Sequence, residues 1–160
     1  MIIGIDPGLS GAVCLLDGDR LEVFDLATTE RVVNGKTKRQ LDLHSLANDL
    51  RCCPLALVRF VLVEQVAAMP GQGVTSSFNF GFTAGAIQGV VAALGFPLRT
   101  VHPQVWKRKF GLLGQPKDAS RAEASRRFPQ YADQWPLKKH DGRAEAALLA
   151  LYGMMMENTP

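Results

Sequence analysis

The first 26 residues constrain the fold most, because they hold three strand-like segments joined by short turns. These segments are Ile2–Asp6, Ala12–Leu16 and Leu21–Leu26. The tetrapeptide DGDR at 17–20 is typical of a tight hairpin turn, which joins antiparallel neighbours. The sequence therefore predicts an antiparallel meander of three strands at the start of the chain.

Strand-like and helical patterns alternate in the rest of the chain. The apolar run FVLVEQ at 60–65 is typical of a strand buried on both faces, and 97–101 is a second short strand. Helices are predicted at 41–51, 78–95, 103–112, 117–128 and 141–156. This order favours one α/β domain over residues 1–160, built on a central mixed five-stranded sheet flanked by helices.

Two details of this prediction rest on local residue types. Ser76 or Ser77 is the expected N-cap of the helix that ends at Gly95. The polar, basic stretch at 28–40 is interpreted as a loop or an irregular edge. The three cysteines show no disulfide or zinc pattern and are interpreted as small core residues.

Charge is distributed unevenly along the chain. The net charge is only +3, yet the segment 99–127 holds eight basic residues and two acidic ones. Such a patch favours a polyanionic partner, although a solvated helix face has the same composition. The sequence shows neither a signal-peptide pattern nor a membrane-spanning apolar segment. We therefore expect an intracellular protein, cytoplasmic or in a mature organellar form, with no membrane partner.

Acidic residues end both central strands, and two more begin the last helix. Asp6 ends the first strand, and Glu64 ends the strand at 60–65. Asp141 and Glu145 are four residues apart, so they lie one turn apart on one helix face. Carboxylates in one small volume repel one another without a cation, and oxygen ligands suit Mg²⁺ or Mn²⁺. Two such ions can activate a water for phosphodiester hydrolysis.

Each acid also has a simpler explanation. Asp6, in an Asp-Pro-Gly sequence, can be a turn former, and Glu64 can mark the end of a buried strand. An acid pair at i and i+4 is usually exposed. The coincidence of all four with a basic segment favours a site over these separate explanations.

Three segments together resemble the RuvC-type Holliday junction resolvases of the ribonuclease H superfamily. They are IGIDPGLSGAV at 3–13, VLVEQ at 61–65 and HDGRAEAALLALYG at 140–153. The resemblance covers nearly the whole chain and is nearest to the chloroplast resolvases and related phage and bacterial proteins. It implies a ribonuclease H-like fold and a homodimer that nicks a four-way DNA junction. It also implies two Mg²⁺ or Mn²⁺ ions per site and no nucleotide cofactor.

The resemblance also assigns roles to the acids. Asp6, Glu64 and Glu145 match metal-binding acids of the family, whereas Asp141 stands where some chloroplast-type members have His. Bacterial RuvC proteins have their two late acids three residues apart rather than four. His140 is therefore an alternative to Asp141 as a ligand, or a phosphate contact.

Several basic residues are candidate DNA contacts. Lys107 and Lys117 stand near positions where RuvC-type enzymes have DNA-contacting lysines. Lys138, Lys139 and Arg143 flank the acids and are candidates to hold the scissile strand, although solvated surface residues fit the same pattern.

Aromatic residues are the second class of candidate DNA contacts. Bacterial RuvC proteins place an aromatic shortly after the glutamate, where this chain has Ala67 or Ala68. Phe78 and Phe80 are therefore candidates to stack on unpaired bases at the junction. Packing of these rings between helix and sheet explains the pattern equally well. Trp106 is interpreted as a core residue.

The same residues also fit other functions. The stretch GIDPGLS also resembles the phosphate-binding hairpin of sugar kinases and Hsp70-like ATPases, but 160 residues leave no room for their second lobe. A ribonuclease H-like nuclease acting on RNA·DNA hybrids or on RNA would share the acids. A junction-binding protein without catalysis would have lost one of them.

Overall fold

The computed structural model describes residues 1–67, 71, 73–116 and 118–157. Its central five-stranded sheet has the order β3-β2-β1-β6-β7. The strands are β1 (Ile2–Asp6), β2 (Ala12–Asp17), β3 (Arg20–Asp25), β4 (Thr28–Val33), β5 (Lys36–Leu41), β6 (Phe60–Glu64) and β7 (Leu98–Val101). The helices are α1 (Leu43–Arg51), α2 (Val74–Ala93), α3 (Pro103–Lys109), α4 (Ala119–Arg127) and α5 (Asp141–Glu157).

The pairing of the strands confirms the predicted mixed sheet. β1, β2 and β3 are antiparallel neighbours, whereas β6 is parallel to β1 and β7 is parallel to β6. The turn at 17–20 joins β2 to β3 as the sequence predicted, because Asp17 and Arg20 pair directly across it. The sheet therefore combines an N-terminal meander with parallel strands that need helical crossovers.

Alternation along the central strands gives the sheet two apolar faces. In β1, Ile2 belongs to the core cluster that contains α5, whereas Ile3 and Ile5 belong to the cluster that contains α1 and α2. In β6, Phe60 and Leu62 likewise lie on the α5 side. Since successive side chains of a strand point to opposite faces, a strand buried on both faces forms a continuous apolar run.

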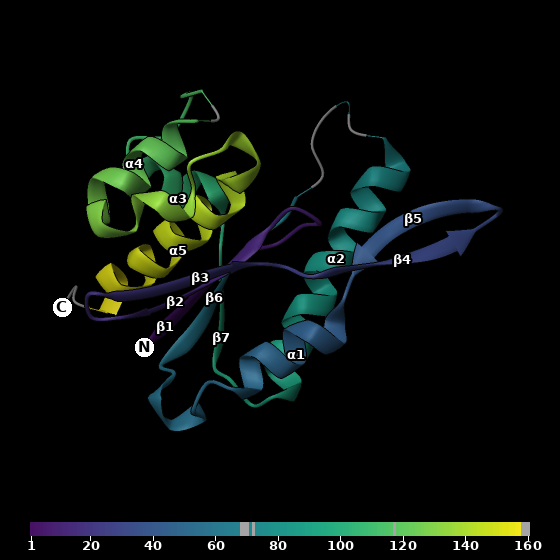
Figure 1. Cartoon of the computed structure of the whole chain (residues 1–160), viewed down its shortest axis with the longest axis horizontal. Helices are drawn as coiled ribbons and strands as arrows, with labels where there is room; N and C mark the ends of the chain where they lie inside the picture. The colour runs from purple at the N-terminus through teal and green to yellow at the C-terminus, as the bar shows by residue number, and fades with distance from the viewer. Residues whose placement is uncertain (68–70, 72, 117, 158–160) are drawn as a thin grey trace.

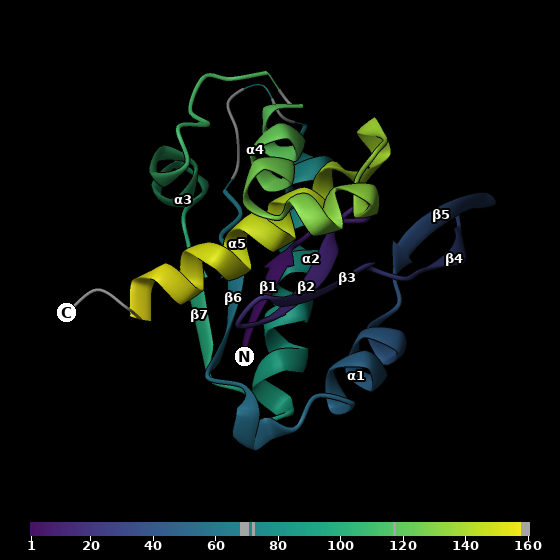
Figure 2. The same cartoon turned by 60° about the vertical axis from the view of Figure 1, so that its left-hand side comes forward.

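Helices cover both faces of this sheet (Figure 1). α5 crosses one face in contact with β1, β2, β3 and β6, and α4 packs against α5. α1 and α2 lie on the opposite face, as the turned view in Figure 2 also shows. The predicted docking residues of α5 are buried, which confirms that interpretation: Ala144, Ala147, Leu148 and Leu149.

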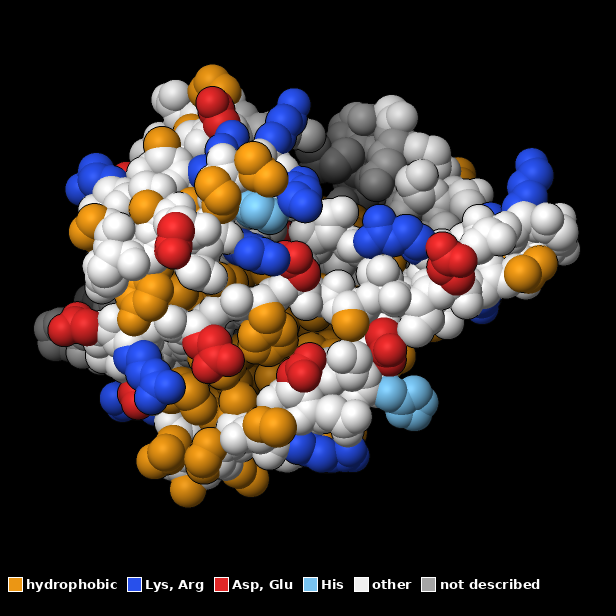
Figure 3. Space-filling model, viewed as in Figure 1, with side chains coloured by type: hydrophobic (Ala, Val, Ile, Leu, Met, Phe, Trp, Pro, Cys, Tyr) orange, Lys and Arg blue, Asp and Glu red, His pale blue; other side chains and the backbone are white. Residues whose placement is uncertain are grey.

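Residues 28–40 form neither a loop nor an irregular edge, so that prediction was wrong. β4 and β5 pair as an antiparallel hairpin, separate from the five-stranded sheet. Asn34 and Gly35 at its tip have φ values of 51° and 71°, as a two-residue type I′ turn requires. The hairpin projects from the body of the protein, and its visible surface is mainly polar or charged (Figures 1 and 3). Strands with so few buried side chains lack the apolar alternation from which strands are recognised.

Helix termini follow local capping chemistry. The carboxylate of Asp42 accepts hydrogen bonds from the backbone N–H groups of His44 and Ser45, both at 3.0 Å, and so caps α1. α2 begins after Gly73 rather than at Ser76 or Ser77, so that prediction was wrong. Glycine is tolerated at the N-cap although it has no side chain to accept a hydrogen bond, and Gly73 has the extended backbone of that position.

Two further findings concern cysteines and the membrane. Cys14 and Cys53 are buried, as predicted, but Cys52 is exposed. Over the described ranges, none of the helices combines the length and the apolar character needed to cross a bilayer.

Candidate active site

Asp6 lies at the carboxyl end of β1, on the face of the sheet that α5 covers. Ile2 and Gly4 precede it at alternate positions of the same strand, so their side chains share that face. Gly4 allows α5 to approach β1 closely, because a Cβ there would collide with backbone atoms of Ala146 and Ala150. Asp6 therefore lies between the strand end and the helix.

Glu64 lies beside Asp6, at the end of the neighbouring parallel strand. The register pairs Ile5 with Val63, so its continuation brings Glu64 next to Asp6. Nε1 of the buried Trp106 in α3 donates a hydrogen bond of 3.1 Å to Oε2 of Glu64. Strand pairing thus places the backbone of Glu64, and the indole orients its side chain.

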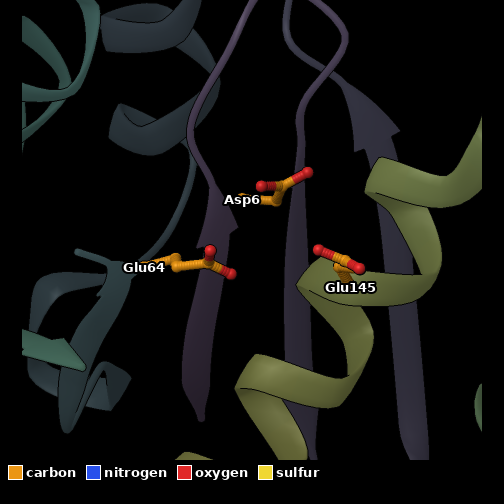
Figure 4. A group of neighbouring side chains, drawn as sticks. All are labelled: Asp6, Glu64 and Glu145. Carbon is orange, nitrogen blue, oxygen red and sulfur yellow. The ribbon is translucent and has the colours of Figure 1, made fainter. Parts of the chain in front are cut away.

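Glu145 reaches the same place from α5. The first turn of this helix passes close to the loop after β1 because Gly142 stands at the contact. A Cβ at Gly142 would lie 2.5 Å from the carbonyl oxygen of Ser10 and 3.0 Å from Oδ2 of Asp6. Glu145 follows one turn later and points toward the two strand-borne acids (Figure 4).

The three carboxylates converge on one small volume. One oxygen each from Asp6, Glu64 and Glu145 lies within 4.8 Å of the others. Burial raises the pKa of Asp6 well above its usual value, and the charges of Glu145 and Glu64 add to this effect. Burial also raises the pKa of Glu64 to about 7, with the charge of Lys107 acting against it. A bound cation would offset the charge repulsion that adds to the effect of burial.

The donor set fits a hard divalent cation. Within the described part of the chain, the cluster offers only carboxylate oxygens, with neither His nor Cys among its members. Oxygen ligands of this kind suit Mg²⁺ and Mn²⁺, whereas nitrogen and sulfur ligands favour zinc and copper. The sequence-based expectation of Mg²⁺ or Mn²⁺ therefore agrees with the chemistry of the cluster.

Lys107 balances part of the negative charge. Its Nζ donates a hydrogen bond of 3.0 Å to Oε1 of Glu145 and lies 5.1 Å from the centre of the Trp106 ring. Burial acts against the charged form, but the charge and hydrogen bond of Glu145 raise the pKa of Lys107. Oγ of Ser120, in α4, donates a second hydrogen bond of 2.9 Å to the same oxygen of Glu145. Glu145 is therefore held from two sides.

A pocket of about 370 Å³ adjoins the cluster, and Asp141 lies in its wall. Asp6, Glu145 and Lys107 also line this pocket. Asp141 is not one of the three converging acids, and its Oδ1 lies 2.6 Å from Nε of Arg121. The fourth predicted ligand thus faces the pocket with its carboxylate already paired to a guanidinium.

The basic residues predicted to flank the acids have different surroundings. Arg143 forms two hydrogen bonds of 2.7 Å with the carboxylate of Asp25, and these bonds lower the pKa of Asp25. Lys138 and Lys139 are exposed, in a short 3₁₀ turn before α5. Lys117 lies outside the described residues.

His140 ends the same 3₁₀ turn. Its Nδ1 accepts a hydrogen bond of 3.4 Å from the backbone N–H of Leu137. Burial and the neighbouring charge of Arg143 lower the pKa of His140. His140 is not among the residues that line the acidic pocket.

The aromatic residues of α2 differ in exposure. Phe78 and Phe82 are 70% and 67% exposed and stack on each other with ring centroids 6.5 Å apart. Neither ring therefore packs between helix and sheet. Phe80 is half-buried, and a Cβ at Gly8, which lines the acidic pocket, would lie 3.8 Å from its ring. Ala68, one of the two alanines at the family's aromatic position, lies outside the described residues.

Four contacts of the acids were not foreseen from the sequence. They are the hydrogen bonds of Trp106 to Glu64, of Lys107 and Ser120 to Glu145, and of Arg121 to Asp141. Trp106 was interpreted only as a core residue, which its burial confirms. A buried indole N–H needs an acceptor, and that requirement was the available signal for its second role.

Comparisons with known proteins agree with this architecture. No protein-family model matches the chain. A chloroplastic Holliday junction resolvase, MOC1 of Chlamydomonas reinhardtii, is 32% identical over 102 residues, which are 63% of this chain and 11% of that protein. The chain therefore spans about a tenth of the length of this curated relative.

Two solved structures of Thermus thermophilus RuvC share the fold. One covers 97% of this chain and 96% of its own, with a TM-score of 0.54 and 18% identity. The other, a complex with a Holliday junction substrate, covers 96% and 95%, with a TM-score of 0.57 and 16% identity. The predicted ribonuclease H-like fold is confirmed, and the resemblance to RuvC-type resolvases is supported from both sequence and structure.

Proposed function

We propose that this protein is a metal-dependent endonuclease that resolves four-way DNA junctions by nicking two opposing strands. The observation that carries this proposal is the convergence of Asp6, Glu64 and Glu145 on one edge of a RuvC-like sheet. The relative named as a Holliday junction resolvase, and the RuvC structure with a junction substrate, support the choice of DNA substrate.

The acids would hold two Mg²⁺ or Mn²⁺ ions. Asp6, Glu64 and Glu145 form the core of this site, and Asp141 joins them once its pair with Arg121 opens. Such ions, when bound, supply an activated water and stabilise the leaving oxygen of a phosphodiester. The proposed products carry 5′-phosphate and 3′-hydroxyl ends.

The side chains around the acids would prepare this site before DNA arrives. Trp106 keeps Glu64 turned toward the cluster, and Ser120 does the same for Glu145. Lys107 stays protonated in its pair with Glu145, so an incoming phosphate would compete with that carboxylate for its ammonium group. Because these groups are fixed by packing, little reorganisation is needed when the substrate binds.

Further DNA contacts would surround this pocket. Lys138 and Lys139 are exposed and free to contact phosphates, and Lys117 is proposed to do the same. Arg143 and His140, at the start of α5, are proposed as further phosphate contacts beside the scissile strand.

The aromatic residues of α2 complete the proposed DNA surface. Phe80 lies against the loop that follows Asp6, where it could contact unpaired bases. Phe78 is exposed and could stack on a base.

A homodimer would place two such sites on opposing strands, because a two-fold axis relates them. We propose that residues 1–160 form one nuclease domain and that α2 supplies the dimer surface. A Cβ at Gly81, Gly85 or Gly89 would meet open space, so this face of the helix is uncovered in the single chain. The protein would act in whichever intracellular compartment holds its DNA substrate.

The test is incubation of the protein with a mobile four-way junction, with and without Mg²⁺. We expect paired nicked duplexes only with Mg²⁺, and no nicking by Asp6→Asn, which should still bind the junction. Nicking of the junction by Asp6→Asn at the wild-type rate would refute the assignment. Parallel assays with an RNA·DNA hybrid distinguish a hybrid nuclease, and binding without any cleavage indicates a non-catalytic junction binder.

A further inference from the structure

A basic groove separates the β4–β5 hairpin from α2. It has a volume of about 200 Å³, and the hairpin, α2 and the loop after β1 all line it. The hairpin contributes Arg31, Lys38 and Arg39, and none of the described lining residues is acidic. Figure 3 shows Lys and Arg side chains along this hairpin. The groove and the acidic pocket have no described lining residue in common. Basic residues line the groove, whereas acidic residues dominate the charged lining of the pocket.

Two of the cations stand where they repel each other. Arg31 and Lys38 are direct partners across the hairpin, and Lys36 lies on the same face at the alternate position. Like charges directly opposite each other destabilise a strand pair. Over the described ranges, neither the side chain of Arg31 nor that of Lys38 makes a hydrogen bond or an ion pair. An anion bound between them would remove the repulsion.

The basic segment at 99–127 differs from the hairpin because many of its basic side chains have acidic partners. Within 99–127, Lys107 is paired with Glu145, Arg121 with Asp141, and Arg126 and Arg127 with Glu123. Much of its positive charge is therefore neutralised within the chain. In the hairpin, by contrast, the side chains of Arg31 and Lys38 have no acidic partner among the described residues and stay available to a ligand.

The groove and the acidic pocket share one loop. Nη2 of Arg39 donates a hydrogen bond of 2.9 Å to the carbonyl oxygen of Leu9, which lines the groove. The neighbours of Leu9 in the chain, Gly8 and Ser10, line the acidic pocket together with Asp6. A continuous polymer could thus run from the acids across this loop into the groove.

Building on the function proposed above, we infer that the hairpin groove binds the sugar-phosphate backbone of a DNA arm leaving the acidic pocket. Arg31 and Lys38 neutralise its phosphates. The ring of Phe82, which lines the opposite wall and is 67% exposed, contacts a sugar or a base. Arg39 fixes the hairpin relative to the site of cleavage. A nucleic acid fits better than an acidic protein, because the groove adjoins a pocket suited to a phosphodiester.

The experiment measures junction binding in EDTA, over a series of salt concentrations, for wild type and Arg31→Ala/Lys38→Ala. Each lost phosphate contact lowers the slope of log K against log salt by about 0.9, so the double variant should lose about 1.8. Arg20→Ala/Arg51→Ala removes two exposed cations outside the groove and should keep the wild-type slope. The charge-conserving Arg31→Lys/Lys38→Arg should keep it too. Phe82→Ala should weaken binding without changing the slope.

Equal slopes for wild type and Arg31→Ala/Lys38→Ala would overturn the inference. Poly-L-glutamate serves as a second probe: if only its binding is lost in that variant, the surface belongs to an acidic protein partner and the inference also fails. Thermal unfolding of each variant verifies that the fold is intact. Since binding in EDTA needs no cleavage, a wild type that binds DNA but never nicks it would refute the proposed function and leave the groove's role standing.

Discussion

Nε1 of Trp106 donates a hydrogen bond of 3.1 Å to Oε2 of Glu64, across 42 residues of sequence. The indole is fully buried, so Glu64 also satisfies the only polar atom of that side chain. Glu64 supplies one oxygen to the three-acid cluster as well. Trp106 is therefore a positioning residue for the proposed metal site, and its packing keeps one of the three acids in place.

Trp106→Phe tests this positioning role. Loss of the hydrogen bond leaves the carboxylate of Glu64 free to rotate, and loss of such outer contacts typically costs 10- to 100-fold in metal affinity or activity. We expect the Mg²⁺ concentration for half-maximal junction nicking to rise by about tenfold. The rise of the melting temperature on adding Mg²⁺ should shrink in parallel.

Trp135→Phe is the matched control for that variant. Trp135 is also buried, and its Nε1 donates a hydrogen bond of 2.9 Å to Oγ of Ser125, away from the acids. It should lower stability without changing the Mg²⁺ requirement. Equal Mg²⁺ requirements for the two variants would show that Trp106 serves packing alone.

The stability of the metal-free protein should fall as pH rises from about 4.5 to above 7. Glu64 has a pKa of about 7 in the fold against 4.5 when unfolded, so the unfolded state releases its proton first. Below pH 4.5 both states are protonated and no penalty exists, whereas above pH 7 the ionised site costs about 3 kcal/mol. Glu64→Gln should therefore stabilise the metal-free protein at pH 8.

Urea unfolding in EDTA at pH 4.5 and at pH 8 measures this effect. We expect Glu64→Gln to be more stable than wild type only at pH 8, and Mg²⁺ to stabilise only the wild type there. A constant difference between the two proteins at both pH values would contradict the prediction.

Asp141 and Arg121 should have opposite effects on metal affinity. If Asp141 becomes a ligand once its pair with Arg121 opens, Asp141→Asn should raise the Mg²⁺ requirement by about tenfold. Arg121→Ala removes the competing guanidinium and should lower the requirement. Glu145→Gln, which changes a member of the cluster itself, should abolish nicking. If the Mg²⁺ requirement of Asp141→Asn equalled that of wild type, Asp141 would not be a metal ligand and would serve only in its ion pair with Arg121.

Phe78→Ala and Phe80→Ala should both impair junction nicking more than binding to linear duplex, if these rings stack on unpaired bases. Their stabilities should differ, because Phe78 is 70% exposed and Phe80 is half-buried. We expect Phe78→Ala to keep its unfolding free energy within about 0.5 kcal/mol of wild type, and Phe80→Ala to lose more. If a variant lost junction nicking and binding to linear duplex to the same extent, its ring would serve general DNA affinity or packing instead.

Much of the candidate site could be anticipated because strands obey a simple period. Asp6 and Glu64 each end an apolar run, and neighbouring parallel strands bring such positions together. The position of Glu145 does not follow from the period of the strands, because it depends on how closely α5 approaches β1. Gly142 and Gly4 decide that approach, yet neither residue indicates from the sequence which backbone it will face.

The β4–β5 hairpin, in contrast, was not predicted from the sequence. Its Asn34-Gly35 turn was visible in the sequence, but the flanking residues were polar and lacked the alternation of a half-buried strand. The prediction therefore failed where backbone hydrogen bonds, rather than burial, hold the strands together. The groove it forms with α2 was for the same reason not anticipated.

The order of residues alone determined the five strands of the central sheet, the helices and the two acids that end β1 and β6, because burial imposes periods of 2 and 3.6 on the chain. Only the tertiary structure decided which cations stay free. It paired Arg121 with Asp141 and left Arg31 and Lys38 without an acidic partner among the described residues, because ion pairs depend on distances between side chains that sequence spacing does not fix.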